Sequence, residues 1–465
     1  MKDMERGKVY IIGAGPGDPE LITLKGKKVL SQCDFVIYDS LVDKSILKYV
    51  NKKAEFICPD ELGETYSNGF LKNQNMINEI ILKKVEEGKN VVRLKNGDPF
   101  IFGRAKEELD FLEKNNIEYY VIPGITTGNC TSVYSGVPLT MRNISSSVIF
   151  LTGHQIENPE NPIRWDIISQ LETIVFYMAC ENIKQIFEKL IENGMDRKTP
   201  FIIIYNVSKI GQRIFEGEIG NSENIFSTLK PPLIVIIGNV VKKRFKWFEK
   251  TKKILFFGIS PKRYFEDGII FHIPLIEIKE LDDYSGFDEE LKKIKEYDWI
   301  IFTSRFGVIY FFKRLFHLNY DARILSNLKI AAIGNSTGNK LKRYGIIPDL
   351  IPSKESSTGL IEEFKKIDIK DKKIFLPRSD ISDKGLKIEL GKMGCYVKSL
   401  ICYRNVLPTN IPEIDFSLFD EIIFTSPSTV RNFKKVFLEL PDISIKYIGE
   451  VTERTLKNEF YNEKI

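Results

Sequence analysis

The sequence predicts an α/β fold along its whole length, divided into four lobes. Short β-branched runs, among them Val9–Ile12, Phe35–Tyr38 and Ile174–Tyr177, alternate with stretches in which apolar residues recur at helical spacing. Two such helical stretches are Ile77–Glu87 and Glu107–Asn115. A basic break near the middle of the chain and an internal repeat beyond it predict how the lobes are divided.

The composition excludes several classes of protein. The 465-residue chain has 68 Lys and Arg and 63 Asp and Glu, so its formal charge is +5. This small excess of positive charge does not indicate a surface that binds nucleic acid. No apolar run reaches the roughly 18–20 residues of a membrane span, and the charged start of the chain does not resemble a signal peptide. Six cysteines without a CxxC pair and three histidines argue against a disulfide framework or a metal site. We therefore expect a cytoplasmic protein that binds neither membrane, nucleic acid nor metal.

The break is the basic stretch KKRFKWFEKTKK at 242–253, which follows one apolar strand candidate and precedes another, Ile254–Phe257. We interpret it as a linker between two domains, 1–246 and 247–465. The alternative interpretation is a patch that guides an acidic ligand.

Beyond the break the sequence repeats itself. IIFTSRFGVIYFFKRL at 300–315 corresponds to IIFTSPSTVRNFKKVF at 422–437, and IAAIGNSTGNKL at 330–341 corresponds to KYIGEVTERTL at 446–456. The same two strand–turn–helix signatures thus recur in the same order. They predict a duplicated α/β lobe with a cleft between the copies.

Three loops after predicted strands in the first half have the residues of a ligand-binding site. They are GAGPGDP at 13–19, NGDPFIFGR at 96–104 and PGITT at 123–127. Glycines allow tight turns and close approach of the backbone to a ligand. Pro16 removes an amide donor within the first loop, which opposes a nicotinamide-dependent dehydrogenase. Each loop alone could be a structural turn, but the three together indicate a binding site for a ligand with little phosphate character.

These loops, with VPLTMR at 137–142 and SSVIFLTGH at 146–154, resemble the signatures of the tetrapyrrole methylase family, especially its uroporphyrinogen III C-methyltransferase branch. The resemblance covers about residues 7–250. It implies a two-lobed α/β domain that binds S-adenosylmethionine between its lobes and methylates uroporphyrinogen III at positions 2 and 7 to give precorrin-2. The methyl-donor contacts that it implies are Pro16, Asn96, Gly97, Asp98, Ile101, Thr126, Thr127, Met178 and Val207.

By the same resemblance, Asp39 is the proton acceptor of methyl transfer; the alternative is that Asp39 caps a helix. The sequence also departs from the family. Asp60-Glu61-Leu62 replaces a Gly-Lys-Arg stretch and Met141 replaces a histidine, so we assign no proton donor. Three cations, Lys25, Arg104 and Arg142, are candidates for binding the carboxylates of the substrate.

The second half resembles uroporphyrinogen III synthase in the stretches WIIFTSRFGV, IFLPRSD, CYRNV and YIGEVTERTL. This implies a two-lobed, duplicated α/β domain with lobes of about 253–275 plus 408–465, and 276–407. Tyr403 matches a recurrent functional position and is a candidate general acid; the alternative is a partly buried strand tyrosine. Hydroxyl-rich turns after the strands, such as Ser356-Ser357-Thr358, either cap helices or line an anion-binding cleft.

Together the two resemblances imply a bifunctional enzyme of corrinoid or sirohaem synthesis. The second half would close hydroxymethylbilane to uroporphyrinogen III, and the first half would methylate that product. The resemblance further leads us to expect a homodimer formed through the methylase domain. The alternatives are a methylase acting on another corrin precursor and a second half that binds tetrapyrroles without catalysis.

Overall fold

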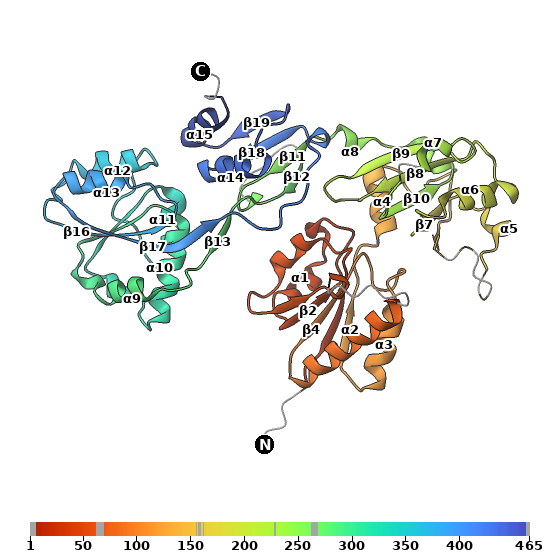
Figure 1. The fold of residues 1–465 in the computed structure, drawn as a ribbon, viewed down its shortest axis with the longest axis horizontal. Coiled ribbons are helices and arrows are strands. Elements are labelled where there is room, and N and C mark those ends of the chain that lie inside the picture. The colour runs from red at the N-terminus through yellow and green to blue at the C-terminus, as the bar shows by residue number, and fades with distance from the viewer. Residues whose placement is uncertain are drawn as a thin grey trace. The chain divides into compact units, whose positions relative to one another are not determined.

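The computed structural model describes residues 6–61, 69–154, 156, 160, 162–226, 229–261 and 268–461. The chain divides into two compact units, Met1–Lys252 and Lys253–Ile465. Each unit contains two sheets with helices on their faces, so the predicted α/β class is confirmed (Figure 1). The domain division after residue 246 stays a prediction.

The first sheet of the first unit is entirely parallel, in the order β3-β2-β4-β1-β5. The inner strands β2 and β4 are buried along their length because helices cover both faces, and this explains the continuous apolar run of β2. The strands are β1 (Val9–Gly13), β2 (Phe35–Tyr38), β3 (Glu55–Ile57), β4 (Val91–Lys95) and β5 (Tyr119–Ile122). The helices are α1 (Leu24–Leu30), α2 (Gly69–Glu86) and α3 (Ala105–Lys114).

The second sheet of this unit has the order β6-β7-β10-β8-β9 and is mostly antiparallel. Helix α4 (Thr127–Ser135) leads into it from the first sheet. Its strands are β6 (Ile149–Thr152), β7 (Ile174–Tyr177), β8 (Pro200–Tyr205), β9 (Arg213–Glu218) and β10 (Leu233–Ile237). Its helices are α5 (Trp165–Ile168), α6 (Ile183–Glu192), α7 (Glu223–Phe226) and α8 (Trp247–Lys250).

The second unit begins and ends in the same sheet. Its order is β12-β11-β18-β19, all parallel, so the green β11 and β12 lie beside the blue β18 and β19 (Figure 1). The strands are β11 (Lys253–Phe256), β12 (Ile269–His272), β18 (Glu421–Phe424) and β19 (Ser444–Tyr447), with helices α14 (Pro427–Phe437) and α15 (Glu450–Phe460). Phenylalanine rings in mutual contact, including Phe257, Phe424 and Phe433, fill its core.

The other sheet of the second unit lies between these segments in the sequence, in the order β13-β17-β16-β14-β15. Only the edge strand β13 is antiparallel to its neighbour. The strands are β13 (Glu277–Lys279), β14 (Trp299–Phe302), β15 (Lys329–Ala332), β16 (Lys373–Ser379) and β17 (Tyr396–Val406). The helices are α9 (Ser285–Lys292), α10 (Arg305–His317), α11 (Asn335–Lys342), α12 (Ser357–Phe364) and α13 (Gly385–Lys392).

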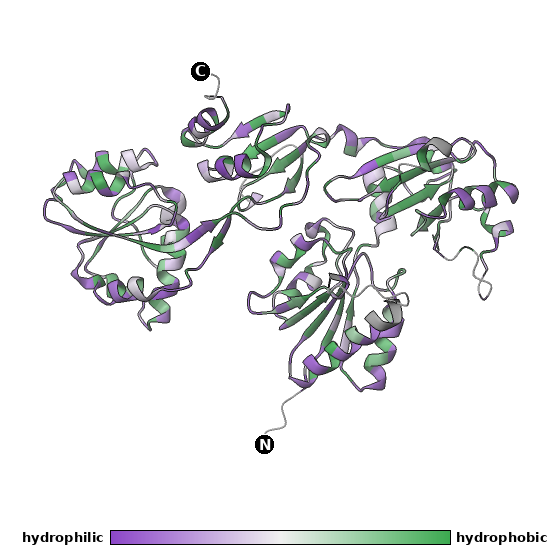
Figure 2. Ribbon diagram, viewed as in Figure 1, coloured by the Kyte–Doolittle hydropathy of each residue, from purple (hydrophilic) through white to green (hydrophobic). Residues whose placement is uncertain are grey.

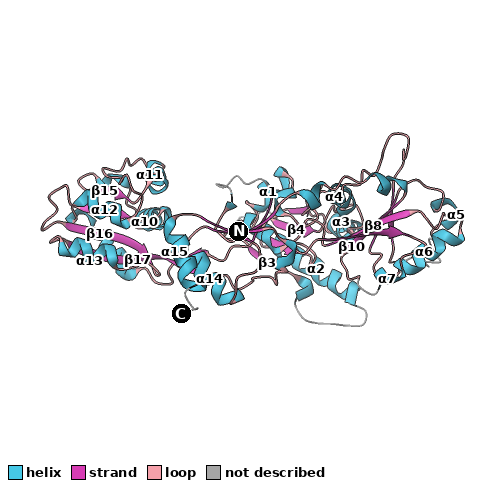
Figure 3. Ribbon diagram, turned by 90° about the horizontal axis from the view of Figure 1, so that it is seen from above, coloured by secondary structure: helices cyan, strands magenta, loops and turns pink. Residues whose placement is uncertain are grey.

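The repeat in the sequence is a repeat in the structure. The order β14–α10–β15–α11 in one sheet recurs as β18–α14–β19–α15 in the other, which confirms the predicted duplication. Most strands are largely apolar, while the helices carry both hydrophilic and hydrophobic residues (Figure 2) and cover the strands (Figure 3). In the part of the chain that the structure describes, no helix is long and apolar enough to cross a membrane, and no group of residues is arranged to hold a metal ion.

Serine hydroxyls cap three helices of the second unit: Ser304 at α10, Ser356 at α12 and Ser426 at α14. At α12 the amide of Gly359 donates a hydrogen bond to Ser356 Oγ at 3.0 Å. The capping interpretation of these hydroxyl-rich turns is therefore confirmed at these positions.

We predict that Ser356→Ala destabilises α12 by about 1 kcal/mol, because it removes the acceptor of an otherwise unpaired helix amide. Hydrogen exchange of the first-turn amides of α12 measures this effect. Ser357→Ala is the matched control, because the Ser357 hydroxyl bonds to no described residue. Equal protection in both variants would contradict the assigned cap.

Candidate functional sites

The three glycine-containing loops of the first unit meet at the carboxyl edge of its parallel sheet. Gly15 and Gly97 exchange backbone hydrogen bonds of 3.2 and 2.8 Å, and Gly124 donates to Asp98 Oδ2 at 3.0 Å. A Cβ on Gly124 would lie 2.2 Å from the Gly97 carbonyl oxygen, so a larger residue could not fit there. Because β1, β4 and β5 are adjacent and parallel, their following loops converge on one place.

The second sheet adds residues to the same place. The Tyr177 hydroxyl, at the end of β7, bonds to Thr126 Oγ1 at 2.7 Å and accepts from the Gly128 amide at 2.8 Å. Met178 follows Tyr177 directly. It has a left-handed φ of 52° and is 49% exposed. Val207, after β8, packs in one apolar cluster with Ile125.

The structure therefore brings together the loops that carry most of the predicted methyl-donor contacts. Pro16, Asn96, Gly97, Asp98, Thr126 and Thr127 lie on the converging loops, Ile101 is exposed in the turn that follows Asp98, and Met178 and Val207 come from the second sheet. The Oδ1 atom of Asn96 is buried and has no hydrogen-bond partner among the described residues. A bound group with an N–H or O–H donor would satisfy this atom.

A segment after β8 holds the first loop from the side of the second sheet. The Asp18 amide donates to Ser208 Oγ at 3.0 Å, and Lys209 Nζ donates to the Leu41 carbonyl at 2.6 Å. The methylenes of Lys209 lie against Gly17, where a Cβ would be 2.4 Å from its Cγ. Burial lowers the pKa of Lys209, and Asp43 opposes this shift. Sequence reasoning missed this contact because it joins segments far apart in the chain.

Asp39 follows β2, and its side chain forms an ion pair with Arg93 of β4. Its own amide donates to the Leu94 carbonyl at 3.3 Å. No helix begins at Ser40; the next helical turn, Lys44–Tyr49, is capped by Asp43. The alternative that Asp39 is a helix cap is therefore wrong.

Behind Asp39 lies a buried network of charges. Glu108 of α3 is fully buried, and its Oε1 accepts from Arg93 Nε and from Lys95 Nζ, both at 2.8 Å. Arg93 and Lys95 project from the same face of β4 because they are two residues apart in a strand. Burial alone would lower the pKa of Arg93, but Asp39 and Glu108 outweigh it and raise the pKa above its usual value. Two cations in a strand that is buried on both faces are the signal that sequence reasoning missed.

The residues that depart from the family pattern have ordinary surroundings. Asp60 accepts a hydrogen bond from the Ser40 amide at 3.0 Å, while Leu62 lies outside the described residues. Met141 packs against an apolar cluster that contains Tyr177. The three candidate cations for substrate carboxylates, Lys25, Arg104 and Arg142, are all exposed.

In the second unit, Tyr403 lies in β17 at a position that is 6% exposed. Its hydroxyl is 2.8 Å from Ser304 Oγ, which also accepts from the Gly307 amide as the cap of α10. The ring stacks on Tyr310 with centroids 5.7 Å apart. Burial raises the pKa of Tyr403, while hydrogen bonds with Ser304 and Ser379 act in the opposite direction. Tyr403 is thus a protonated phenol at neutral pH in a hydroxyl-rich turn region.

Comparison with known proteins identifies both units. The family of tetrapyrrole (corrin/porphyrin) methylases matches residues 8–222, and uroporphyrinogen-III synthase HemD matches residues 266–463. A porphyrin biosynthesis protein HemD of Ruminiclostridium josui is 32% identical, over 98% of this chain and 94% of its own length. The chain belongs to the fused tetrapyrrole methylases and uroporphyrinogen-III synthases.

Other relatives match the methylase half of this fused protein. The uroporphyrinogen-III C-methyltransferase of Bacillus subtilis is 40% identical over 53% of this chain and 96% of its own length. The siroheme synthase of Nitrosomonas europaea is 38% identical over a stretch that covers 53% of this chain and 52% of that relative. A solved uroporphyrin-III C-methyltransferase from Thermus thermophilus, complexed with S-adenosylhomocysteine, is 29% identical over 51% of this chain and 94% of that chain, with a TM-score of 0.43.

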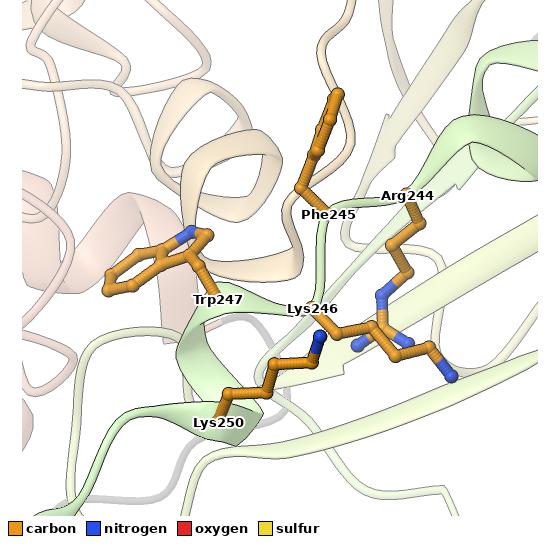
Figure 4. Close-up of a pocket in the computed structure, with 5 residues that line it drawn as sticks. All are labelled: Arg244, Phe245, Lys246, Trp247 and Lys250. Atoms are coloured by element: carbon orange, nitrogen blue, oxygen red, sulfur yellow. The ribbon is translucent and has the colours of Figure 1, made fainter.

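The basic stretch of the fused protein lies at the end of the first unit and packs against α4 there. Trp247 Nε1 donates to the Val133 carbonyl of α4 at 2.7 Å, and the Phe245 amide donates to the Gly136 carbonyl at 2.7 Å. Arg244 forms ion pairs with Glu216 and Glu249. Arg244, Phe245, Lys246, Trp247 and Lys250 line a pocket in which Arg244 and Lys246 extend to one side and Trp247 to the other (Figure 4).

We predict that Glu108→Gln destabilises the first unit by about 3–5 kcal/mol. The substitution removes the carboxylate that Arg93 and Lys95 share, so that Asp39 is the one described carboxylate left to pair with these two buried cations. Native-state hydrogen exchange of the β4 amides measures this loss. Glu107→Gln, one position earlier and exposed, should change protection by less than about 0.5 kcal/mol. Equal protection in the two variants would show that the network does not hold β4.

Proposed function

We propose that this chain catalyses two consecutive steps of tetrapyrrole synthesis. The second unit closes hydroxymethylbilane to uroporphyrinogen III, and the first unit methylates uroporphyrinogen III at positions 2 and 7 to give precorrin-2. The observation that carries the proposal is the match of one chain to both families, with a relative that shares nearly its whole length. The product of the second unit would then be the substrate of the first.

The residues on the converging loops fit S-adenosylmethionine, the methyl donor of this family. The donor carries amino and hydroxyl groups, and either can satisfy the buried Asn96 Oδ1. We assign the donor site to Pro16, Asn96, Gly97, Asp98, Ile101, Thr126, Thr127, Met178 and Val207. The glycines let the backbone approach the ligand closely, and the contact of Tyr177 with Thr126 sets the position of Met178.

When bound, S-adenosylmethionine supplies an activated methyl group. The chain then has two tasks: to align the pyrrole carbon with that methyl and to take up the proton that the methylated ring must lose. We assign the second task to Asp39, whose carboxylate is exposed for about a third of its side-chain surface. Arg93 holds one oxygen of Asp39, so the carboxylate is oriented before substrate binds.

In the second unit we propose that Tyr403 donates a proton to the departing hydroxyl of hydroxymethylbilane. Its raised pKa keeps the phenol protonated at neutral pH, so a proton is available. Most of the rate enhancement would come from holding the linear tetrapyrrole in a folded conformation. The match of residues 266–463 to the synthase family favours this over a half that only binds tetrapyrroles.

The proposal also includes a cytoplasmic location, a homodimer formed through the methylase domain, and domain limits of 1–246 and 247–465. The dimer is tested by sedimentation of the full chain. A mass of one chain across the micromolar range would contradict it.

Turnover of uroporphyrinogen III tests the methylase function directly. We expect the purified chain and S-adenosylmethionine to give a product that carries two added methyl groups, identified by mass spectrometry. The same reaction with S-adenosylhomocysteine in place of the donor is the control. Absence of any methylated product from intact uroporphyrinogen III would contradict the proposal.

We predict that Asp39→Asn lowers kcat for methyl transfer by about 100-fold, because an amide cannot accept the proton. The affinity for S-adenosylhomocysteine, measured by calorimetry, should stay within about twofold, since Asp39 is not among the assigned donor contacts. Asp110→Asn is the control, because the one described partner of the exposed Asp110 side chain is Lys106. Unchanged turnover in Asp39→Asn would contradict the proposed role of Asp39 as proton acceptor and leave it as the ion-pair partner of Arg93.

A further inference from the structure

The second unit contains a buried cation that forms no ion pair with any residue that the structure describes. Arg378, near the end of β16, is 8% exposed. Its Nη1 donates to the backbone carbonyl of Asp383, but its Nε is buried and has no hydrogen-bond partner. Nε and Nη2 form one edge of the guanidinium, and this edge donates to no residue that the structure describes. No described carboxylate forms an ion pair with Arg378.

This arrangement is unlike that of the buried cations in the first unit. Arg93 and Lys95 are also buried, at 3% and 4% exposed, but both bond to the carboxylate of Glu108. Burial lowers the pKa of Arg378, with Asp383 and Tyr403 acting in the opposite direction. A buried charge without a partner is costly, and proteins keep such a group where a ligand supplies the missing charge.

The surroundings of Arg378 are polar and lie at the carboxyl ends of adjacent parallel strands. Tyr403 is close enough to act electrostatically on Arg378, and its hydroxyl bonds to Ser304 at the end of β14. The side-chain oxygen of Asn405, Oδ1, is also buried and has no hydrogen-bond partner among the described residues.

Two carboxylates near Arg378 are occupied with backbone amides. Asp380 Oδ1 accepts from the amides of Ile381 and Asn405, at 3.0 and 2.9 Å, and Asp383 Oδ1 accepts from the Gly385 amide. Neither of them forms a described hydrogen bond or ion pair with the guanidinium, although Asp383 acts on it electrostatically.

We propose that Arg378 binds a carboxylate of the tetrapyrrole substrate in the second unit, through the free edge formed by Nε and Nη2. The inference rests on the proposed synthase function and names a residue that fixes the orientation of its substrate. A guanidinium edge and a carboxylate match in two parallel hydrogen bonds, so one acidic side chain of the tetrapyrrole is held in a defined direction next to Tyr403. A lysine offers a point charge without this two-bond geometry.

The test compares Arg378→Met and Arg378→Lys with the wild-type full chain. We expect KM for hydroxymethylbilane to rise about 10- to 100-fold in Arg378→Met and less in Arg378→Lys, with kcat changed by less than about threefold. Arg323→Met is the control, since Arg323 is an exposed arginine paired with its neighbour Asp321. Methylation of preformed uroporphyrinogen III should be equal in all four proteins.

Stability separates binding from a structural role. Arg378→Met removes a buried charge without a partner, so its resistance to unfolding without ligand should equal or exceed that of wild type. If Arg378→Met has an unchanged KM and unfolds more easily than wild type, the inference is overturned. Arg378 would then have a structural role, as the hydrogen-bond donor to the Asp383 carbonyl.

A wild-type chain that does not close hydroxymethylbilane would refute the proposed function, and the inference would then be decided by binding alone. Uroporphyrin III, a fluorescent octacarboxylate, serves as the probe in equilibrium titrations of wild type and Arg378→Met. A loss of affinity of about tenfold or more in the variant supports the carboxylate site. Equal affinity refutes it.

Discussion

The buried carboxylate of Glu108 is the interaction on which the first unit depends. It neutralises two cations that β4 carries into the interior, and each cation reaches a different part of the candidate site. Arg93 holds Asp39 at the end of β2, while Lys95 is the last residue before the loop that contains Asn96 and Gly97. The proposed proton acceptor and the proposed donor loop are thus fixed to one strand by one charge, and both positions are set before any ligand binds.

The second unit uses a different arrangement. Serines cap its helices α10, α12 and α14, and its candidate general acid bonds to the cap of α10. The buried cation there, Arg378, forms no ion pair with a carboxylate in the described part of the chain. The first unit therefore balances its interior charges internally, whereas the second leaves one positive charge for an acidic ligand. This difference fits the two reactions: methyl transfer needs a fixed base, and ring closure needs a firm hold on a flexible polycarboxylate.

Much of the fold could be predicted because its signals are local. The limits of β2 and β7 agree with the predicted Phe35–Tyr38 and Ile174–Tyr177 to the residue, and the repeated signatures predicted the duplicated order of elements. Helix α2 begins at Gly69, earlier than the predicted Ile77, because the polar run KNQN at 72–75 interrupts the apolar period.

The charge networks could not be predicted because they depend on contacts distant in the sequence. Glu108 appeared only as one residue of an amphipathic helix, and Arg378 only as one letter of a motif. Local sequence also left Asp39 open between a cap and a functional group. The structure excludes the cap, because residues 39–42 form a turn and the next helical turn is capped by Asp43.

The central claim is that one chain carries out both steps in sequence, and a coupled assay from hydroxymethylbilane tests it most directly. The purified chain is incubated with and without S-adenosylmethionine, the ring isomers are separated by chromatography, and the products are identified by mass. The account predicts uroporphyrinogen III without the donor and its dimethylated product with the donor. Formation of only the type I ring under both conditions would contradict it.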